Sequence, residues 1–194
     1  MSIKKFKECA DRGDILGVVF ALEHIEDIDA IHGSLAKNTV LTYVLNTAAP
    51  DLVTFALAKE ANPSTKSADG ISPLHIATER GYSDVCAMLL EKGADVNATD
   101  PNIQTALHRA CRNKRHEICK LLMEKGADTG ARDMLGWTPL HTAVFEGNTK
   151  GVELLLGRGV GVNPLTKQGV TPLRLAKIHM HVDIAKLLVY AGAK

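Results

Sequence analysis

The chain has 194 residues, 45% of them hydrophobic, and a formal net charge of +1 at pH 7. This hydrophobic fraction is typical of a globular protein, and the length fits one domain or two small ones. Because the chain is nearly neutral and has no acidic or basic tail, its bulk charge gives no indication of binding to nucleic acid or to a membrane surface.

The beginning of the chain places Lys4, Glu8 and Arg12 among apolar residues, which excludes the apolar core of a secretory signal. No apolar run approaches the roughly 20 residues that a membrane-spanning helix needs, so we expect no membrane insertion. The cysteines form no CxxC pair, which favours reduced thiols. We therefore expect a soluble cytoplasmic protein, with the nucleus as the other open location. The four cysteines are Cys9, Cys86, Cys111 and Cys119.

A six-residue motif recurs along the chain at a fixed step of 33 residues. It reads SPLHIA from residue 72, TALHRA from 105, TPLHTA from 138 and TPLRLA from 171, and a degraded copy, TVLTYV, begins at 39. A second motif keeps the same phase: GADVN from 93, GAD from 126 and GVGVN from 159. Two independent motifs at one period indicate an internal repeat.

Each repeat carries the local signals of two short helices. Thr or Ser before Pro-Leu is typical of an N-cap followed by proline at the first helical position. Gly81 separates the two helices of its repeat and Gly93 ends the second. Helices of about nine residues are not stable alone, so each repeat must bury its apolar face on its neighbours. We expect an elongated, curved stack.

These motifs resemble the ankyrin repeat, which has a 33-residue unit, a TPLHxA motif and a turn followed by two helices. The resemblance implies an all-α fold, an ankyrin-repeat solenoid of helix-turn-helix units with short turn or hairpin fingers. We expect one domain, residues 1–194, with six repeats. These are a divergent N-terminal capping repeat at 4–33, internal repeats at 34–66, 67–99, 100–132 and 133–165, and a C-terminal capping repeat at 166–194.

Some positions depart from the repeat. Lys114 and Met180 occupy the position that Gly81 and Gly147 fill in other repeats, which costs on the order of 1 kcal/mol if the backbone there is left-handed. Gly161 replaces the aspartate of the second motif, so we expect a looser connection before the last repeat.

The sequence gives little support for chemistry. His75, His108 and His141 lie at the same position of successive repeats, too far apart to share a metal ion, and the resemblance implies that they hydrogen-bond neighbouring loops. No P-loop, GxGxxG, GxSxG or HExxH motif is present. We therefore predict no enzyme activity, no metal, no cofactor and no small-molecule substrate. Leu89 and the run Asp95-Val96-Asn97 resemble the substrate pattern of an asparaginyl hydroxylase that acts on ankyrin proteins, so Asn97 is a candidate for this modification.

The resemblance implies that a partner binds to the concave face formed by the fingers and the exposed edges of the first helices. Trp137, the only tryptophan, lies there and is the predicted anchor, because interface hot spots are enriched in Trp, Tyr and Arg. The alternative is that Trp137 folds back on its own neighbouring finger. The predicted partner-binding residues are Asp69, Ile71, Arg80, Asn102, Gln104, Arg112, Asn113, Arg132, Met134, Leu135, Trp137, Phe145, Glu146 and Lys167.

We therefore predict a non-catalytic protein–protein interaction module that acts as an adaptor, inhibitor or targeting subunit. An alternative is a regulatory or nucleic-acid-associated factor that uses the basic cluster Arg109–Lys120. Because no aromatic residue lies within that cluster to stack on bases, nucleic acid is the disfavoured partner. Self-assembly through the apolar final helix is a further alternative.

Overall fold

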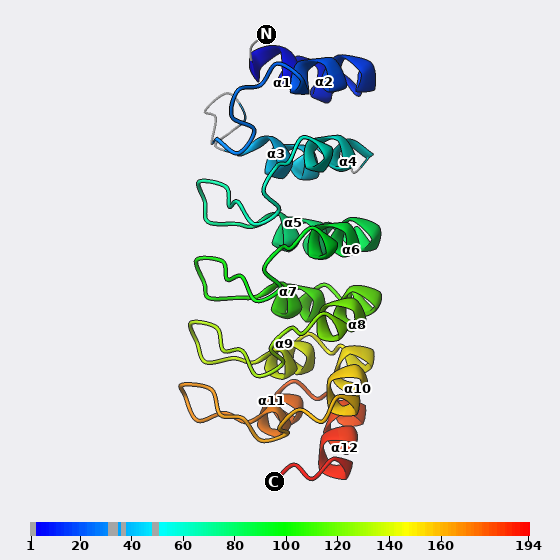
Figure 1. The fold of residues 1–194 in the computed structure, drawn as a ribbon. Helices are drawn as coiled ribbons and strands as arrows, with labels where there is room; N and C mark the ends of the chain where they lie inside the picture. Colours follow the sequence, from blue (N-terminus) through cyan, green and yellow to red (C-terminus); the bar gives the residue numbers. More distant parts are fainter. Residues whose placement is uncertain (1–2, 31–34, 36–37, 48–50) are drawn as a thin grey trace. The chain divides into compact units, whose positions relative to one another are not determined.

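The computed structural model describes residues 3–30, 35, 38–47 and 51–194 of the chain (Figure 1). These residues form twelve α-helices, which confirms the predicted fold class, an all-α ankyrin-repeat solenoid. The chain divides into two compact units, Met1–Pro101 and Asn102–Lys194, here called unit 1 and unit 2. The predicted repeat boundary between residues 33 and 34 lies outside the described residues, and the prediction of a single domain stays a prediction.

Unit 1 is built from stacked helix pairs. Neighbouring helices pair in chain order, α3 also packs against α5, and α2 packs against α4. The stacking stabilises helices of only seven to ten residues, which are too short to persist alone. Leu41, Leu52, Leu74 and Leu89 are among the fully buried side chains of this core. The helices are α1 (Ile3–Arg12), α2 (Ile15–Leu22), α3 (Val40–Asn46), α4 (Asp51–Ala58), α5 (Pro73–Arg80) and α6 (Ser83–Glu91).

Unit 2 repeats the same arrangement with two rows of helices. The first helices α7, α9 and α11 pack against one another in one row, and the second helices α8, α10 and α12 form the other (Figure 1). The loops before α9 and α11 project beyond the first helices as fingers (Figure 1). The helices are α7 (Ala106–Arg112), α8 (His116–Glu124), α9 (Pro139–Phe145), α10 (Thr149–Gly157), α11 (Pro172–Ile178) and α12 (Val182–Tyr190).

The predicted N-caps occur at every 33-residue step. The side-chain oxygen of Thr39 accepts the N–H of Thr42 at 3.2 Å, and that of Thr171 accepts the N–H of Arg174 at 3.2 Å. These contacts satisfy backbone donors that the first turn of a helix leaves without a partner. Each cap residue has extended backbone directly before a first helix: Thr39, Ser72, Thr105, Thr138 and Thr171.

The left-handed conformation predicted between paired helices is confirmed. Lys114 has φ 54° and Met180 has φ 56°, at the position where Gly147 has φ 60°. Two further non-glycine residues with positive φ were not anticipated, although the same step of 33 residues would have found them. Ile103 (φ 60°) stands where the fingers before α5, α9 and α11 have glycine. Glu60 (φ 60°) stands where a glycine follows each of the later second helices α6, α8, α10 and α12.

No helix within the described ranges combines the length and the apolar character needed to cross a bilayer.

Candidate functional site

The finger before α9 is a tight turn held by one buried carboxylate. The N–H of Asp133 donates to the carbonyl of Trp137 at 2.9 Å, and Asp133 Oδ1 accepts the N–H groups of Leu135 and Trp137, each at 2.9 Å. Gly136, with φ 75°, supplies the left-handed residue of the turn, and its N–H donates to the Asp133 carbonyl at 2.8 Å. The backbone of this finger is therefore rigid, while Leu135 at its tip is exposed.

Backbone hydrogen bonds join successive fingers of unit 2. The N–H of Met134 donates to the carbonyl of Asn102 at 3.0 Å, and the N–H of Lys167 donates to the carbonyl of Leu135 at 3.1 Å. The exposed tips therefore lie side by side.

The expectation that Gln104 faces solvent is wrong. Gln104 is buried, with 7% of its surface exposed, and its Nε2 donates to Asp133 Oδ2 at 3.0 Å. A buried carboxylate needs such donors, so Gln104 supports the neighbouring finger and is not available to a partner.

One histidine on α7 and one on α9 each connect their own helix to the finger that follows it, as the resemblance implies. Nε2 of His108 lies 3.0 Å from the Trp137 carbonyl, and Nε2 of His141 lies 3.1 Å from the Val170 carbonyl. Nδ1 of His141 accepts the N–H of Thr138 at 3.2 Å, so the proton of the neutral ring is on Nε2. Burial lowers the pKa of His141, which keeps this ring neutral. These groups are structural.

Apolar side chains gather on the fingers and first helices of unit 2. Leu135 is 54% exposed, Phe145 is 41% exposed and Ile103 is 50% exposed. Trp137 is only half-buried, which places it between the two alternatives: its ring packs edge-on against Phe145, with ring centroids 5.2 Å apart. Phe145 in turn contacts the ring of His179, with centroids 4.7 Å apart. We call the apolar patch the set Ile103, Met134, Leu135, Trp137, Phe145 and Ile178.

The remaining predicted residues of unit 2 surround this patch. Arg112, Asn113 and Lys167 are exposed, and Glu146 is half-buried. Arg132 is exposed but occupied, because its guanidinium donates to the carbonyls of Gly136 and Leu165 and so braces two successive fingers.

The predicted site residues of unit 1 differ in character. Asp69 is exposed and Ile71 is half-buried. Arg80 donates to the carbonyl of Asn46 at 3.0 Å, so it caps the end of α3. Lys66 donates to the carbonyl of Thr99 at 2.6 Å, the brace that Arg132 makes in unit 2. The finger before α5 therefore presents the polar side chains of Lys66 and Asp69.

The basic cluster Arg109–Lys120 does not form one free surface. Lys120 pairs with Glu117 at 3.3 Å on α8, and His116 Nε2 lies 2.9 Å from Asn148 Oδ1. Arg112 and Lys114 remain exposed at the end of α7. The cluster is thus divided between the two rows of helices.

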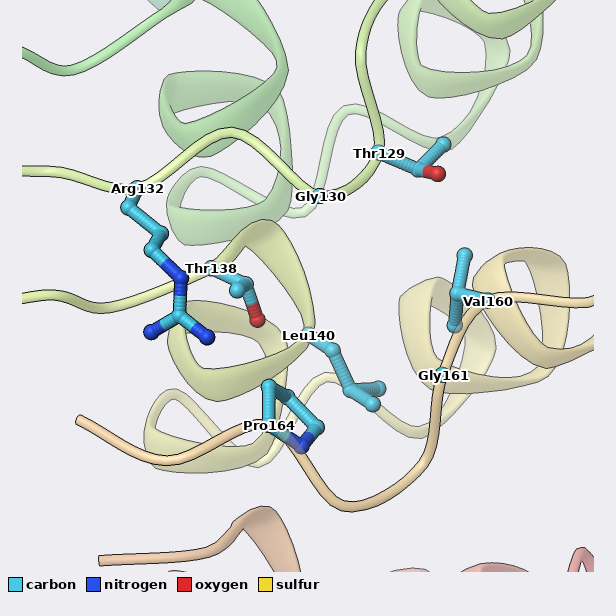
Figure 2. Close-up of a pocket in the computed structure, with 8 residues that line it drawn as sticks. All are labelled: Thr129, Gly130, Arg132, Thr138, Leu140, Val160, Gly161 and Pro164. Atoms are coloured by element: carbon cyan, nitrogen blue, oxygen red, sulfur yellow. The ribbon is translucent and has the colours of Figure 1, made fainter. Parts of the chain in front are cut away.

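A hollow of about 150 Å³ lies beside the fingers of unit 2. Figure 2 shows Arg132 and Thr138 at one end of it and Val160 and Gly161 at the other. Asp128, one repeat earlier than Gly161, accepts the N–H of Gly130 at 2.8 Å. Glycine cannot make this contact, so residue 161 leaves space where the two preceding repeats have Asp95 and Asp128.

Two of the four thiols, those of Cys86 and Cys111, are poor nucleophiles. Burial raises the pKa of Cys86 to about 11, and a hydrogen bond with Cys119, together with burial, raises the pKa of Cys111. Within the described ranges, no group of three or more His, Cys, Asp or Glu side chains could hold a metal ion. Asn97 is exposed in the turn after α6, where its N–H donates to Asp95 Oδ1 at 2.9 Å, and its modification stays a prediction.

Comparison with known proteins gives matches to repeats of one kind. A family model described as "Ankyrin repeats (3 copies)" matches residues 8–100, 40–133 and 107–194. The chain is 39% identical over 62 residues to the human Ankyrin repeat and KH domain-containing protein 1, which is 32% of this chain and 2% of that protein.

Two other relatives match different protein classes. Potassium channel AKT2/3 of Arabidopsis thaliana is 29% identical over 87 residues, which is 45% of this chain and 11% of that protein. The Transient receptor potential cation channel subfamily A member 1 homolog of Caenorhabditis elegans is 42% identical over 59 residues, 29% of this chain and 5% of that protein. The chain therefore spans from 2% to 11% of the length of these three curated relatives.

Proposed function

Because the chain belongs to the ankyrin-repeat family, whose repeats generally bind other proteins and are typically non-catalytic, we propose that it is a protein–protein interaction module that acts as an adaptor, inhibitor or targeting subunit. The partner binds to the fingers and first helices, here called the finger face, and residues 1–194 act as one domain. The observation that carries this proposal is the exposed apolar patch of unit 2, which lies on that face.

The patch has the composition of a contact surface. Exposed clusters of large apolar side chains generally mark a site of interaction. Met134 and Leu135 extend from one finger whose backbone is fixed by hydrogen bonds, so little backbone conformational entropy is lost when a partner binds there. An aromatic pair, Trp137 and Phe145, adjoins these tips and supplies the aromatic surface that hot spots favour.

Trp137 is the proposed anchor. We expect Trp137→Ala to weaken partner binding by about 2 kcal/mol or more. Because Trp137 is half-buried and also packs within the protein, Leu135→Ser at the exposed tip is the companion variant that leaves the core unchanged. Circular dichroism of both variants separates lost binding from lost folding, and unchanged affinity in both would remove the patch from the interface.

A site-specific crosslinking experiment tests the face itself. A photoreactive residue replaces Leu135 on the finger or, as the matched control, Glu153 on the exposed side of α10. In extract of the source cells, we expect a discrete protein adduct from position 135 and none from position 153. Unlabelled wild-type chain should compete for this adduct, and Trp137→Ala should compete poorly. Adducts from position 153 alone, or equal labelling at both positions, would contradict the proposal.

A further inference from the structure

The two units carry opposite charge, although the whole chain is nearly neutral. Residues 1–101 contain nine Lys and Arg against 15 Asp and Glu, whereas residues 102–194 contain 14 against seven. Unit 2 therefore has a formal net charge of +7 and unit 1 of −6. Charge of this size attracts a partner of opposite sign and raises its rate of association.

Most carboxylates of unit 2 lie on the second helices and already have partners. Each of the four on α8, α10 and α12 forms an ion pair with a Lys or Arg, with N–O distances of 3.2 to 3.4 Å. The positive charge on this side is thus largely neutralised by neighbouring side chains. The pairs are Glu117–Lys120, Glu124–Arg158, Glu153–Lys150 and Asp183–Lys186.

The cations around the apolar patch have no such partners. Arg112, Lys114, Lys167 and Lys177 are all exposed, and none lies within 4.0 Å of a carboxylate among residues 102–194, all of which the structure describes. Within α7, α9, α11 and the turns that follow them, the only carboxylate is Glu146. Excess positive charge therefore faces solvent beside exposed apolar side chains.

Backbone strain marks the same surface. Ile103 is β-branched and has φ 60°, a conformation that such residues rarely adopt, and the equivalent positions are Gly70, Gly136 and Gly169. Its side chain is 50% exposed, so burial within the chain explains only part of its presence. Strained residues of this kind gather at ligand-binding positions.

We propose that the finger face of unit 2 binds an acidic segment of a partner protein that carries apolar anchor side chains. This inference rests on the proposed function and specifies the chemistry of the partner. The anchors of the segment cover Ile103, Leu135 and Phe145, and its carboxylates lie beside Arg112, Lys167 and Lys177. The backbone bonds that join the tips place Ile103, Leu135 and Lys167 along successive fingers, which suits a linear segment.

A peptide matches this surface better than a nucleic acid does. The exposed side chains at the centre are mainly aliphatic, and phosphates and ribose gain nothing from covering them. Base stacking needs an open aromatic face, whereas Trp137 is half-buried and its ring packs against those of Phe145 and His141. Partner carboxylates beside the four cations, with Leu or Phe anchors between them, satisfy both parts of the surface.

Selection from a phage-displayed library of short random peptides against the full chain tests the proposal without assuming a ligand. We expect the selected peptides to have net negative charge and at least two large apolar residues. Leu135→Ser should lower the affinity for the consensus peptide, measured by fluorescence anisotropy, at least about tenfold. Lys167→Glu with Lys177→Glu should weaken it by a similar factor, and raising salt from about 0.05 M to about 0.5 M should weaken it several-fold. The matched control is Val189→Ser on the second helix α12, where the side chain is 55% exposed, and it should change nothing.

The outcomes separate the two proposals. Selection of neutral or basic peptides whose binding is lost in Leu135→Ser would contradict the proposal of an acidic partner but leave the proposed function intact. Acidic peptides that bind equally well to Leu135→Ser and to the charge-reversed variant would overturn the proposed face as well. Failure to select any peptide, together with salt-dependent binding of a single-stranded or duplex oligonucleotide, would overturn both in favour of nucleic acid.

Discussion

Replacement of Met180 by glycine tests whether the 33-residue step sets the backbone conformation. Met180 has φ 56°, and its side chain is 83% exposed, so the substitution removes little packing. A left-handed backbone destabilises the fold by about 1–2 kcal/mol when the residue has a side chain, and glycine avoids this cost. Glycine has greater conformational freedom in the unfolded chain, which offsets about 0.5–1 kcal/mol of that advantage. Glycine should therefore stabilise the fold by about 0.5–1 kcal/mol relative to alanine at this position. At an ordinary helical position the order is reversed by about 1 kcal/mol.

Urea denaturation of four variants measures this reversal of sign. Met180→Gly should unfold at higher urea than Met180→Ala. Lys186→Gly should unfold at lower urea than Lys186→Ala, because Lys186 lies within α12 and is exposed. The comparison within each pair cancels the loss of the original side chain. If alanine is the better residue at both positions, then residue 180 is not held in the left-handed conformation and the 33-residue step does not set its backbone.

Three further changes test other contacts. Gly161→Asp should raise the free energy of unfolding, measured by urea denaturation, by about 1 kcal/mol. Asp128 makes a turn contact at the equivalent position of the preceding repeat, and a Cβ at residue 161 meets no atom within 4 Å. A loss of stability would show that this turn is built differently. The Lys7 ammonium and the Tyr43 hydroxyl, both bonded to Asp11, lower the pKa of that carboxyl, so its contribution is present above the unfolded pKa of about 3.9 and is lost as the pH falls through the lower folded pKa. Asp11→Asn should cost about 1 kcal/mol at pH 7 and flatten the acid side of the stability curve, and an unchanged curve would refute this. Ile103→Gly should change the free energy of unfolding by no more than about 1 kcal/mol, because the relief of backbone strain offsets the lost burial and the greater entropy of the unfolded chain. The same variant should bind the selected peptide more weakly, and unaltered binding would remove Ile103 from the patch.

The sequence predicted the parts of the fold that depend on neighbours along the chain. The N-caps at Thr39 and Thr171 and the left-handed Lys114 and Met180 follow from local chemistry repeated at one period. The same period contained the signal for Ile103, which stands in a column of glycines.

Contacts between fingers could not be predicted in the same way. Gln104 looks like an exposed fingertip residue because it is polar and lies in a finger, but it is buried against Asp133, 29 residues further on. Arg132 looks free to bind a partner but donates to the carbonyl of Leu165. Both contacts depend on how closely two backbones approach, which residue types alone do not specify.

The separation of charge was hidden for a different reason. The net charge of +1 is the sum of the opposite charges of unit 1 and unit 2. The residue limits of these units come from the three-dimensional contacts. The pairing of carboxylates with cations on the second helices, which leaves Lys167 and Lys177 unpaired, likewise requires the structure.

Hydrogen–deuterium exchange of the full chain, with and without the selected acidic peptide, tests the finger face most directly. A partner bound there should slow amide exchange in residues 102–104, 133–137 and 145–147, and leave α8 and α10 unchanged. Protection confined to the second helices, or to unit 1, would contradict binding at the apolar patch.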